Sequence, residues 1–324
     1  MSDATAAEGR DADKTAARDR RRPLGLVGLA LLLAALVAAP FLVYPIFAMK
    51  LLCFALFASA FNLLLGYTGL LSFGHATFFG GAAYATAHSV KVWGIDPILG
   101  ILFGTLCAAA MGAVMGVIAI RRQGIYFAMT TLALSQMAYF LFLRAPFTNA
   151  EDGIQNVPRG RALGLVDLSQ PLAMYALTAL VFLIGMGILW RVIHSPFGQV
   201  LTALRENETR AVSLGYRADR YKLGAFVISA TLAGLAGATK ALVFQIATLT
   251  DVAWQMSGEV ILMTLLGGVG TVFGPTVGAG LIVTIQNYLA TSGFPVSVIL
   301  GLLFIVCVLT FRSGIVGEIR KRFG

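Results

Sequence analysis

Long apolar stretches, separated by short polar connections, run through almost the whole chain. They lie at approximately 24–46, 49–66, 76–93, 97–120, 124–143, 171–193, 223–248, 257–272, 275–291 and 295–311. A helix of roughly 20 apolar residues spans the hydrocarbon core of a bilayer, which is about 30 Å thick. We therefore predict an all-α polytopic membrane protein with about ten transmembrane helices, or eight if the segment 257–291 is re-entrant.

The composition agrees with this pattern. Of the 324 residues, 58% are hydrophobic and 12% are charged, whereas about 25% of the residues of an average soluble domain are charged. Little chain remains for a soluble domain. The phosphate-binding loop G-x-x-x-x-G-K-[ST] is absent from the sequence, because no Lys follows a Gly. If ATP powers this protein, another chain must hydrolyse it.

The basic residues indicate the orientation. The formal net charge is +9, and with a cytoplasmic N-terminus 18 of the 24 Lys and Arg residues lie on the predicted inner side. Cytoplasmic segments of membrane proteins collect Lys and Arg, so the excess does not require nucleic acid as a partner. We expect both termini in the cytoplasm. The expected organisation is a disordered tail (1–23), a transmembrane domain (24–312) with an extracytoplasmic loop at about 144–170 and a cytoplasmic loop at about 194–222, and a C-terminal tail (313–324).

The chain offers little chemistry of the kind that enzymes use. Cys53, Cys107 and Cys307 all lie inside apolar windows. They suggest neither a disulfide framework nor a metal site, because no C-x-x-C pair or Cys/His cluster occurs in the sequence. No Ser/His/Asp arrangement or pair of carboxylates stands out, so we expect no catalysis, cofactor or metal in this chain.

Two apolar segments, one in each half of the chain, are interrupted by glycine. They read GYTGLLSFGHATFFGG (66–81) and GGVGTVFGPTVGAG (267–280). Paired broken segments point to the substrate path of a transporter, because irregular backbone is tolerated at membrane depth where it lines a cavity. Close packing of helices through small residues is the alternative. The candidate path residues are Ser72, His75, Thr77, Glu259, Thr264, Gly267, Gly268 and Thr271.

Two ionisable residues of this set allow two interpretations each. Glu259 lies well inside an apolar window, where a carboxylate costs about 2.5 kcal/mol or more unless it is paired or hydrated. It either lines or gates the path, or it has a structural role, as a partner of a group such as Lys240 or at a position near the outer interface after Trp254. For His75 we favour a hydrogen-bonded structural role over a proton relay, because its segment contains no acidic residue.

The cytoplasmic loop carries a helical pattern. Pro196 suits a helix start, and Gly215 suits the position just after a helix end. Apolar residues recur between them at near-helical spacing. The pattern predicts a short amphipathic helix, a break at the glycine and a second short helix that enters the next span. Such a helix either docks into a groove on a cytoplasmic partner or is only a solvated loop helix.

Five stretches together resemble a known family. They are FNLLLGYTGLLSFGHATFFGGAAYAT (61–86), GIYFAMTTLALSQM (124–137), DGIQNVPR (152–159), FGQVLTALRENETRAVSLGYRADRYKLGAFVISATLAGLAGA (197–238) and SGEVILMTLLGGVGTVFGPTVGA (257–279). In this order they resemble the M-type permease subunit of high-affinity branched-chain amino acid ABC importers. The resemblance implies a bacterial inner-membrane permease that works with a homologous second permease, two cytoplasmic ABC ATPases and a periplasmic substrate-binding protein. The family's ATPase-coupling segment falls on Arg205, Glu206, Glu208, Ala211 and Gly215.

One stretch departs from the family. Its extracytoplasmic loop usually reads like T-G-G-x-x-G, whereas here Thr148 is followed by Asn149 and Ala150 before Gly153. The substrate therefore stays open between branched-chain or related amino acids and urea, short amides or aromatic-acid metabolites. The alternative of another class is an ATP-independent secondary transporter or channel. That alternative expects an ion-coupling carboxylate cluster or a charged filter ring, and Glu259 stands nearly alone.

Overall fold

The computed structural model describes residues 43–162, 164 and 166–289, with short pieces at 36, 38–40, 298–299, 301–302, 305 and 314–318. The chain divides into two units, 1–45 and 46–324, and the description below concerns the second. The expected tail 1–23, most of the windows 24–46 and 295–311 and most of the tail 313–324 lie outside the described residues.

Each apolar window from 49–66 to 275–291 coincides with one helix. These helices are α2 (Pro45–Thr68), α3 (His75–Lys91), α4 (Pro97–Ala119), α5 (Ile125–Arg144), α6 (Pro171–Ile193), α9 (Ala218–Phe244), α10 (Trp254–Gly267) and α11 (Gly274–Leu289). The connection between α6 and α9 adds α7 (Pro196–Glu206) and α8 (Glu208–Ser213). Other connections contain the 3-10 turns η1 (Pro146–Thr148) and η2 (Leu249–Asp251) and an antiparallel hairpin of β1 (Arg161–Ala162) and β2 (Val166–Asp167).

Proline and polar caps set several helix starts. Pro97, Pro171 and Pro196 occupy the first turns of α4, α6 and α7, where the missing N–H would have no partner within the helix. The Asp96 side chain accepts a hydrogen bond from Ile98 N at 2.9 Å and caps α4. These starts follow from local sequence alone.

Five helices of the described part are long and apolar enough to cross a membrane, namely α2, α4, α5, α6 and α9. Helix α3 has 17 residues, α10 has 14 and α11 has 16, fewer than the ~20 that a straight span needs. The protein is therefore a helical, polytopic membrane protein. The total of ten helices, or eight with a re-entrant 257–291, stays a prediction.

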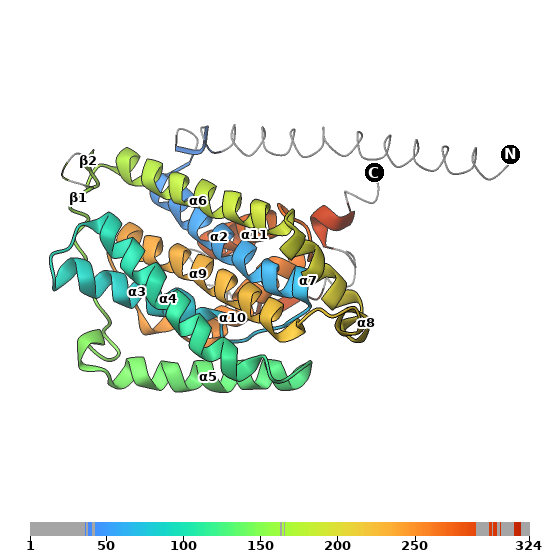
Figure 1. Cartoon of the computed structure of the whole chain (residues 1–324). Coiled ribbons are helices and arrows are strands. Elements are labelled where there is room, and N and C mark those ends of the chain that lie inside the picture. Colours follow the sequence, from blue (N-terminus) through green and yellow to red (C-terminus); the bar gives the residue numbers. More distant parts are fainter. Residues whose placement is uncertain are drawn as a thin grey trace, which may run out of the picture. The chain divides into compact units, whose positions relative to one another are not determined.

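Helix α2 belongs to the core of the helical bundle. Its apolar window is 83% buried, compared with 28% for α5. The Ala60 carbonyl accepts a hydrogen bond from Ser229 Oγ of α9 at 2.5 Å, and the ring of Phe57 stacks on Phe79 of α3 with centroids 4.5 Å apart. Helices α3, α4 and α9 pack against one another, and α10 packs against α11 (Figure 1).

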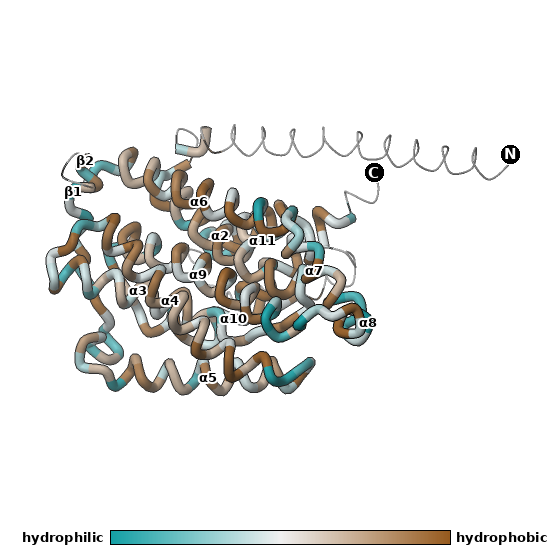
Figure 2. The backbone as a smooth tube through the Cα atoms, in the orientation of Figure 1, coloured by the Kyte–Doolittle hydropathy of each residue, from teal (hydrophilic) through white to brown (hydrophobic). Residues whose placement is uncertain are grey.

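Large apolar side chains cover the outward faces of the peripheral helices. Leu102 and Leu106 of α4, Phe140 of α5 and Ile184 of α6 are 50 to 60% exposed. Figure 2 shows hydrophobic residues along the helices and hydrophilic residues in connections such as α8 and the β1–β2 hairpin. An apolar surface of this extent suits contact with lipid or with another subunit.

The connections gather at two opposite ends of the helices (Figure 1). At one end, Ile154 of the loop 144–170 forms a β-bridge with Ala247 of the α9–α10 connection. At the other end, Gln123 of the α4–α5 connection donates a hydrogen bond to Glu208 of α8 at 3.1 Å. The two long loops therefore lie on opposite sides, as alternating spans require. Which end faces the cytoplasm stays a prediction.

Candidate coupling and translocation sites

Helices α7 and α8 form a structured connection between α6 and α9. Ser195 Oγ accepts a hydrogen bond from Gly198 N at 3.4 Å at the start of α7. Leu204 of α7, Ala211 of α8 and Ala218 of α9 form one small buried cluster. This cluster holds the two short helices against the beginning of the next span.

The structure divides the predicted amphipathic helix in two. Asn207 interrupts it with extended backbone, and its side chain accepts a hydrogen bond from Arg210 N at 2.9 Å, which starts α8. Helix α9 runs without a break from Ala218 to Phe244, so the expected second short helix is the first part of that span. The apolar spacing continues across Asn207 and conceals the break, because a cap is a local hydrogen bond that spacing does not record.

Gly215 follows the end of α8, as the sequence predicts. Its φ is +91°. Gly215 N donates to Val212 O at 2.9 Å, and Tyr216 N donates to Ala211 O at 3.2 Å. These two bonds form a Schellman motif, in which the residue after the helix takes a left-handed conformation. Apart from its chain neighbours, no heavy atom of the described residues lies within 4 Å of the position that a Cβ would take, so the backbone conformation and not the available space favours glycine.

The predicted coupling residues of α8 and its border have different surroundings. Ala211 is buried and Glu206 is exposed. Glu208 forms an ion pair with Lys222 of α9 at 2.6 Å and accepts a hydrogen bond from Gln123 at 3.1 Å. Glu208 therefore holds α8 against its neighbours, whereas Glu206 is available at the surface.

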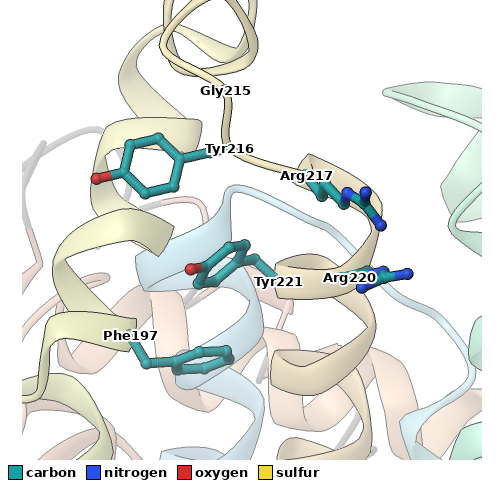
Figure 3. Close-up of a pocket in the computed structure, with 6 residues that line it drawn as sticks. All are labelled: Phe197, Gly215, Tyr216, Arg217, Arg220 and Tyr221. Atoms are coloured by element: carbon teal, nitrogen blue, oxygen red, sulfur yellow. The ribbon is translucent and has the colours of Figure 1, made fainter.

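A hollow of ≈ 440 Å³ lies beside α7 and the start of α9. It is lined by Phe197, Gly215, Tyr216, Arg217, Arg220 and Tyr221. Figure 3 shows the three aromatic rings on one side of the start of α9 and the two guanidinium groups extended together on the other. The rings of Phe197 and Tyr221 stack with centroids 5.6 Å apart. Sequence reasoning missed these aromatic residues, although two tyrosines flank the two arginines in the sequence.

The two glycine-broken segments meet beside α2. Asn62 Nδ2 donates a hydrogen bond to Thr271 O at 2.8 Å, and Asn62 Oδ1 accepts one from Gly270 N at 2.9 Å. A Cβ at Gly66 would lie 2.7 Å from Gly270 N, so only glycine permits this approach. Close packing, one of the two interpretations of the segments, is thus present at this contact. Sequence reasoning missed Asn62. The signal that could have found it is its position as a lone amide side chain inside an apolar window.

Most of the predicted path residues are interior. Ser72, His75, Thr77 and Thr264 are 0% exposed. Ser72 Oγ accepts a hydrogen bond from Gly74 N at 3.2 Å, and Thr77 Oγ1 donates to Ser135 Oγ of α5 at 2.9 Å. These hydroxyl groups hold the start of α3 in place in the present conformation.

The other predicted glycine and threonine positions form the α10–α11 connection. Gly267 is the last residue of α10, and Gly268 follows with φ +120°. Thr271 Oγ1 donates to Gly268 O at 2.8 Å and accepts from Gly274 N at 3.1 Å. Thr271 therefore closes the turn and begins α11.

His75 lies in an aromatic environment at the start of α3. Its Nε2 is 2.8 Å from Ser229 Oγ, and Ser229 donates its own proton to Ala60 O. Ser229 Oγ is therefore the acceptor, and His75 donates from Nε2. The imidazole is surrounded edge-on by Phe61, Phe78 and Phe226. Within the described part of the chain, no group of three or more His, Cys, Asp or Glu residues could hold a metal ion. The contacts of His75 fit a structural role, which stays a prediction.

The buried ion pair joins Lys240 to Asp251, not to Glu259. Lys240 Nζ lies 2.5 Å from Asp251 Oδ2, with side chains 11% and 4% exposed. Glu259 is half-buried and accepts a hydrogen bond from Gln286 Nε2 of α11 at 3.1 Å. The suggested pairing of Glu259 with Lys240 is therefore wrong, because the α9–α10 connection folds back and brings a nearer carboxylate to the lysine. Sequence reasoning missed Asp251 because it lies between two apolar windows.

The loop that departs from the family pattern has a special backbone. Asn149 and Ala150 stand at the positions of the glycine pair, and their φ values are +59° and +53°. Glycine adopts such angles without strain, whereas alanine does not. Gly153, the last glycine of the pattern, has φ +67°. The loop therefore uses glycine-like conformations without the glycine pair.

Arg159 fastens this loop to the end of α9. Its guanidinium donates to Leu242 O at 3.3 Å and to Val243 O at 2.7 Å. Burial lowers the pKa of Arg159 from its ordinary value, but a guanidinium stays protonated in proteins. A cation beside the C-terminal carbonyls of a helix is favourable, so this contact stabilises the C-terminal end of α9.

Comparisons with known proteins extend this picture. The family described as "Branched-chain amino acid transport system / permease component" matches residues 43–310. The chain is 28% identical over 250 residues to the high-affinity branched-chain amino acid transport system permease protein LivM of Escherichia coli. The matched region covers 68% of this chain and 58% of that protein. The chain is 27% identical over 239 residues to a probable branched-chain amino acid transport permease protein LivM of Methanocaldococcus jannaschii, covering 70% and 68%.

A sugar permease is also similar. The ribose import permease protein RbsC of Bacillus subtilis is 26% identical over 245 residues, which cover 68% of this chain and 70% of that protein. The match to the E. coli protein spans 58% of its length, which is less than two thirds. No solved structure matches the chain.

Proposed function

Because the chain belongs to the family of permease components of branched-chain amino acid transport systems, we propose that it is the transmembrane permease subunit of an ATP-driven ABC importer. In this proposal it moves branched-chain or related amino acids, delivered by a periplasmic binding protein, across the bacterial inner membrane into the cytoplasm. Its further partners are a second, homologous permease and two cytoplasmic ABC ATPases. The helices that are long and apolar enough to cross a membrane support a transport role.

The observation that carries the proposal is an apolar surface at the end of α8 and in the connection that follows it. Val212, Leu214 and Tyr216 are 51%, 72% and 41% exposed, and we call these three residues the docking surface. A solvated loop has no need to expose three large apolar side chains close together, whereas a segment that docks on a partner does. Arg217 and Arg220 beside it supply positive charge for acidic groups of the partner (Figure 3).

We place the substrate path along the face that carries Glu259 of α10 and Gln286 of α11. Both side chains are only half-buried in the single chain, and Gln286 Nε2 donates a hydrogen bond to Glu259 Oε2 at 3.1 Å. Ionisable groups at membrane depth usually mark a substrate route. The second permease completes this face. The interior residues of the predicted path set, from Ser72 to Thr271, line the path when the helices around the two breaks separate during transport.

Purification of the tagged chain from its native membrane in mild detergent tests the partners. We expect two ATPases and a second permease in the complex, and ATP-dependent uptake of leucine after reconstitution with the binding protein. The triple variant Val212→Ser/Leu214→Ser/Tyr216→Ser should lose the ATPases, because it removes the docking surface. The control variant Val166→Ser changes a residue that is 49% exposed at the opposite end and should keep them.

One result would reject the importer, and another would reject the docking surface. The first is a wild-type complex without ATPases that takes up substrate in the absence of ATP, which would identify a secondary transporter or channel. The second is an unchanged amount of ATPase in the triple variant, which would remove the docking surface from the argument.

The substrate needs a separate experiment. Similar proteins carry the names of a branched-chain amino acid permease and of a ribose permease, so similarity at this level does not determine the substrate. We expect the copurified binding protein to prefer branched-chain amino acids when it is profiled against urea, short amides, aromatic-acid metabolites and ribose. Preference for one of the other ligands would change the proposed substrate but would not affect the proposed role as a permease.

A further inference from the structure

Arg205 connects helix α7 with both glycine-broken segments. Its aliphatic part passes Gly69, where a Cβ would lie 3.2 Å from Arg205 Cγ. Its Nη1 donates a hydrogen bond to Gly66 O, and the same atom lies 3.4 Å from the position of a Cβ at Gly270. One side chain of α7 is therefore hydrogen-bonded to the end of α2 and lies beside Gly270 in the break between α10 and α11.

The Gly66 carbonyl is a favourable acceptor for this bond. Helix α2 ends at Thr68, and the last four carbonyl groups of a helix have no partner within it. They also form the negative end of the helix dipole, which attracts a guanidinium. Arg205 satisfies an acceptor that α2 leaves open, so a displacement of α7 acts directly on the end of α2.

Asn62 links α2 to the glycine-broken segment between α10 and α11. It lies one turn before Gly66 in α2 and is 2% exposed, and its amide is bonded to both Gly270 and Thr271. One turn earlier, Ser59 Oγ of α2 lies 3.5 Å from Thr276 Oγ1 of α11. Helix α2 is thus bonded to the α10–α11 connection and to α11 along one side.

We propose that Arg205 and Asn62 are positioning residues that transmit movement of α7 to both glycine-broken segments at once. The proposal rests on the proposed function, because it requires an ATPase that moves α7. In the single chain Arg205 as a whole is exposed, so a docked partner can reach it from outside. ATP hydrolysis is then coupled to the path through the hydrogen bonds of Arg205 and Asn62. This coupling is separate from binding at the docking surface.

The test measures how many substrate molecules the complete importer takes up per ATP hydrolysed in proteoliposomes. Arg205→Gln removes the charge and shortens the side chain, and Asn62→Ala removes both amide hydrogen bonds. We expect each variant to lower the ratio about tenfold, in the range of typical coupling between sites. Arg205→Lys keeps a charged donor and should restore part of the ratio. The matched control is Arg210→Gln, an exposed arginine of the same connection, which should leave the ratio unchanged.

Three outcomes would overturn the inference. An unchanged ratio in both Arg205→Gln and Asn62→Ala would show that the hydrogen bonds of these two residues do not couple ATP hydrolysis to uptake. Uptake and hydrolysis that fall in equal proportion with the amount of bound ATPase would assign Arg205 to docking. A lower melting temperature with an unchanged ratio would assign the two residues to stability alone. By contrast, a wild-type protein that neither binds an ATPase nor uses ATP would reject the proposed function itself.

Discussion

Replacing Asp251 by alanine should strongly destabilise the protein, because it leaves the Lys240 ammonium buried without a counter-charge. The two charged atoms are 2.5 Å apart, and the side chains are 11% and 4% exposed. Removing one partner of a buried ion pair costs about 3–5 kcal/mol of the free energy of unfolding. The Thr248 hydroxyl also loses its acceptor, since it donates to Asp251 Oδ2 at 3.0 Å.

A double-mutant cycle measures this effect. It compares Asp251→Ala, Lys240→Met and the double variant by unfolding with SDS in mixed micelles, followed by tryptophan fluorescence. The double variant should cost at least about 2 kcal/mol less than the sum of the single variants, because it leaves no unpaired charge. The control is Lys91→Met. Lys91 is an exposed lysine at the same end whose ammonium donates to Gln155 O at 2.6 Å, and its replacement should cost no more than about 1 kcal/mol.

The reasoning is refuted if Asp251→Ala and Lys240→Met each cost less than about 1 kcal/mol. It is also refuted if their effects add within about 0.5 kcal/mol, the agreement expected of independent sites. Either result would mean that water reaches the pair and screens the charges.

Gly215→Val should lower uptake and substrate-stimulated ATP hydrolysis together in membranes that contain normal amounts of protein, because φ +91° strains a β-branched residue by about 1–2 kcal/mol. Ala150→Gly should raise the free energy of unfolding by about 0.5–1 kcal/mol, because glycine relieves the left-handed backbone; Ala145→Gly, at φ −70°, should lower it. In a chain without its native cysteines, Gln286→Cys should react with water-soluble thiol reagents in the resting protein, whereas Thr77→Cys should react only during turnover.

Each of these outcomes has a clear contrary. Hydrolysis that stays fully responsive in Gly215→Val would exclude the end of α8 from coupling. A loss of stability in Ala150→Gly would mean that the freedom glycine gains in the unfolded chain outweighs the relief of strain. Inert cysteines at both Gln286 and Thr77 throughout turnover would move the path to the second permease.

Local features of the sequence were enough to predict the helices and several of their ends. Each window from 49–66 to 275–291 became one helix, because a helix satisfies its backbone hydrogen bonds within one segment and apolar side chains suit the membrane. The Schellman motif at Gly215 is equally local. Asn207 was missed because its cap competes with an apolar pattern that continues past it.

The pairing of side chains was not predictable in the same way. The sequence showed that Glu259 needs a partner and suggested Lys240, but the lysine is bonded to Asp251 and the glutamate to Gln286. Asn62 gave only a weak signal, although it joins the two broken segments. A polar group in an apolar window must find a partner. The sequence offers several candidate partners and does not distinguish between them.

The sequence by itself therefore determined the class of protein, the helical segments, the presence of two glycine breaks and the family. Only the tertiary structure decided that Arg205 meets Gly66, 139 residues away, and that Asn62 meets Thr271, 209 residues away. The reason is physical. Hydrophobic periodicity and capping depend on neighbours within a few turns of the chain, whereas these contacts depend on how closely helices approach where glycine leaves out a side chain.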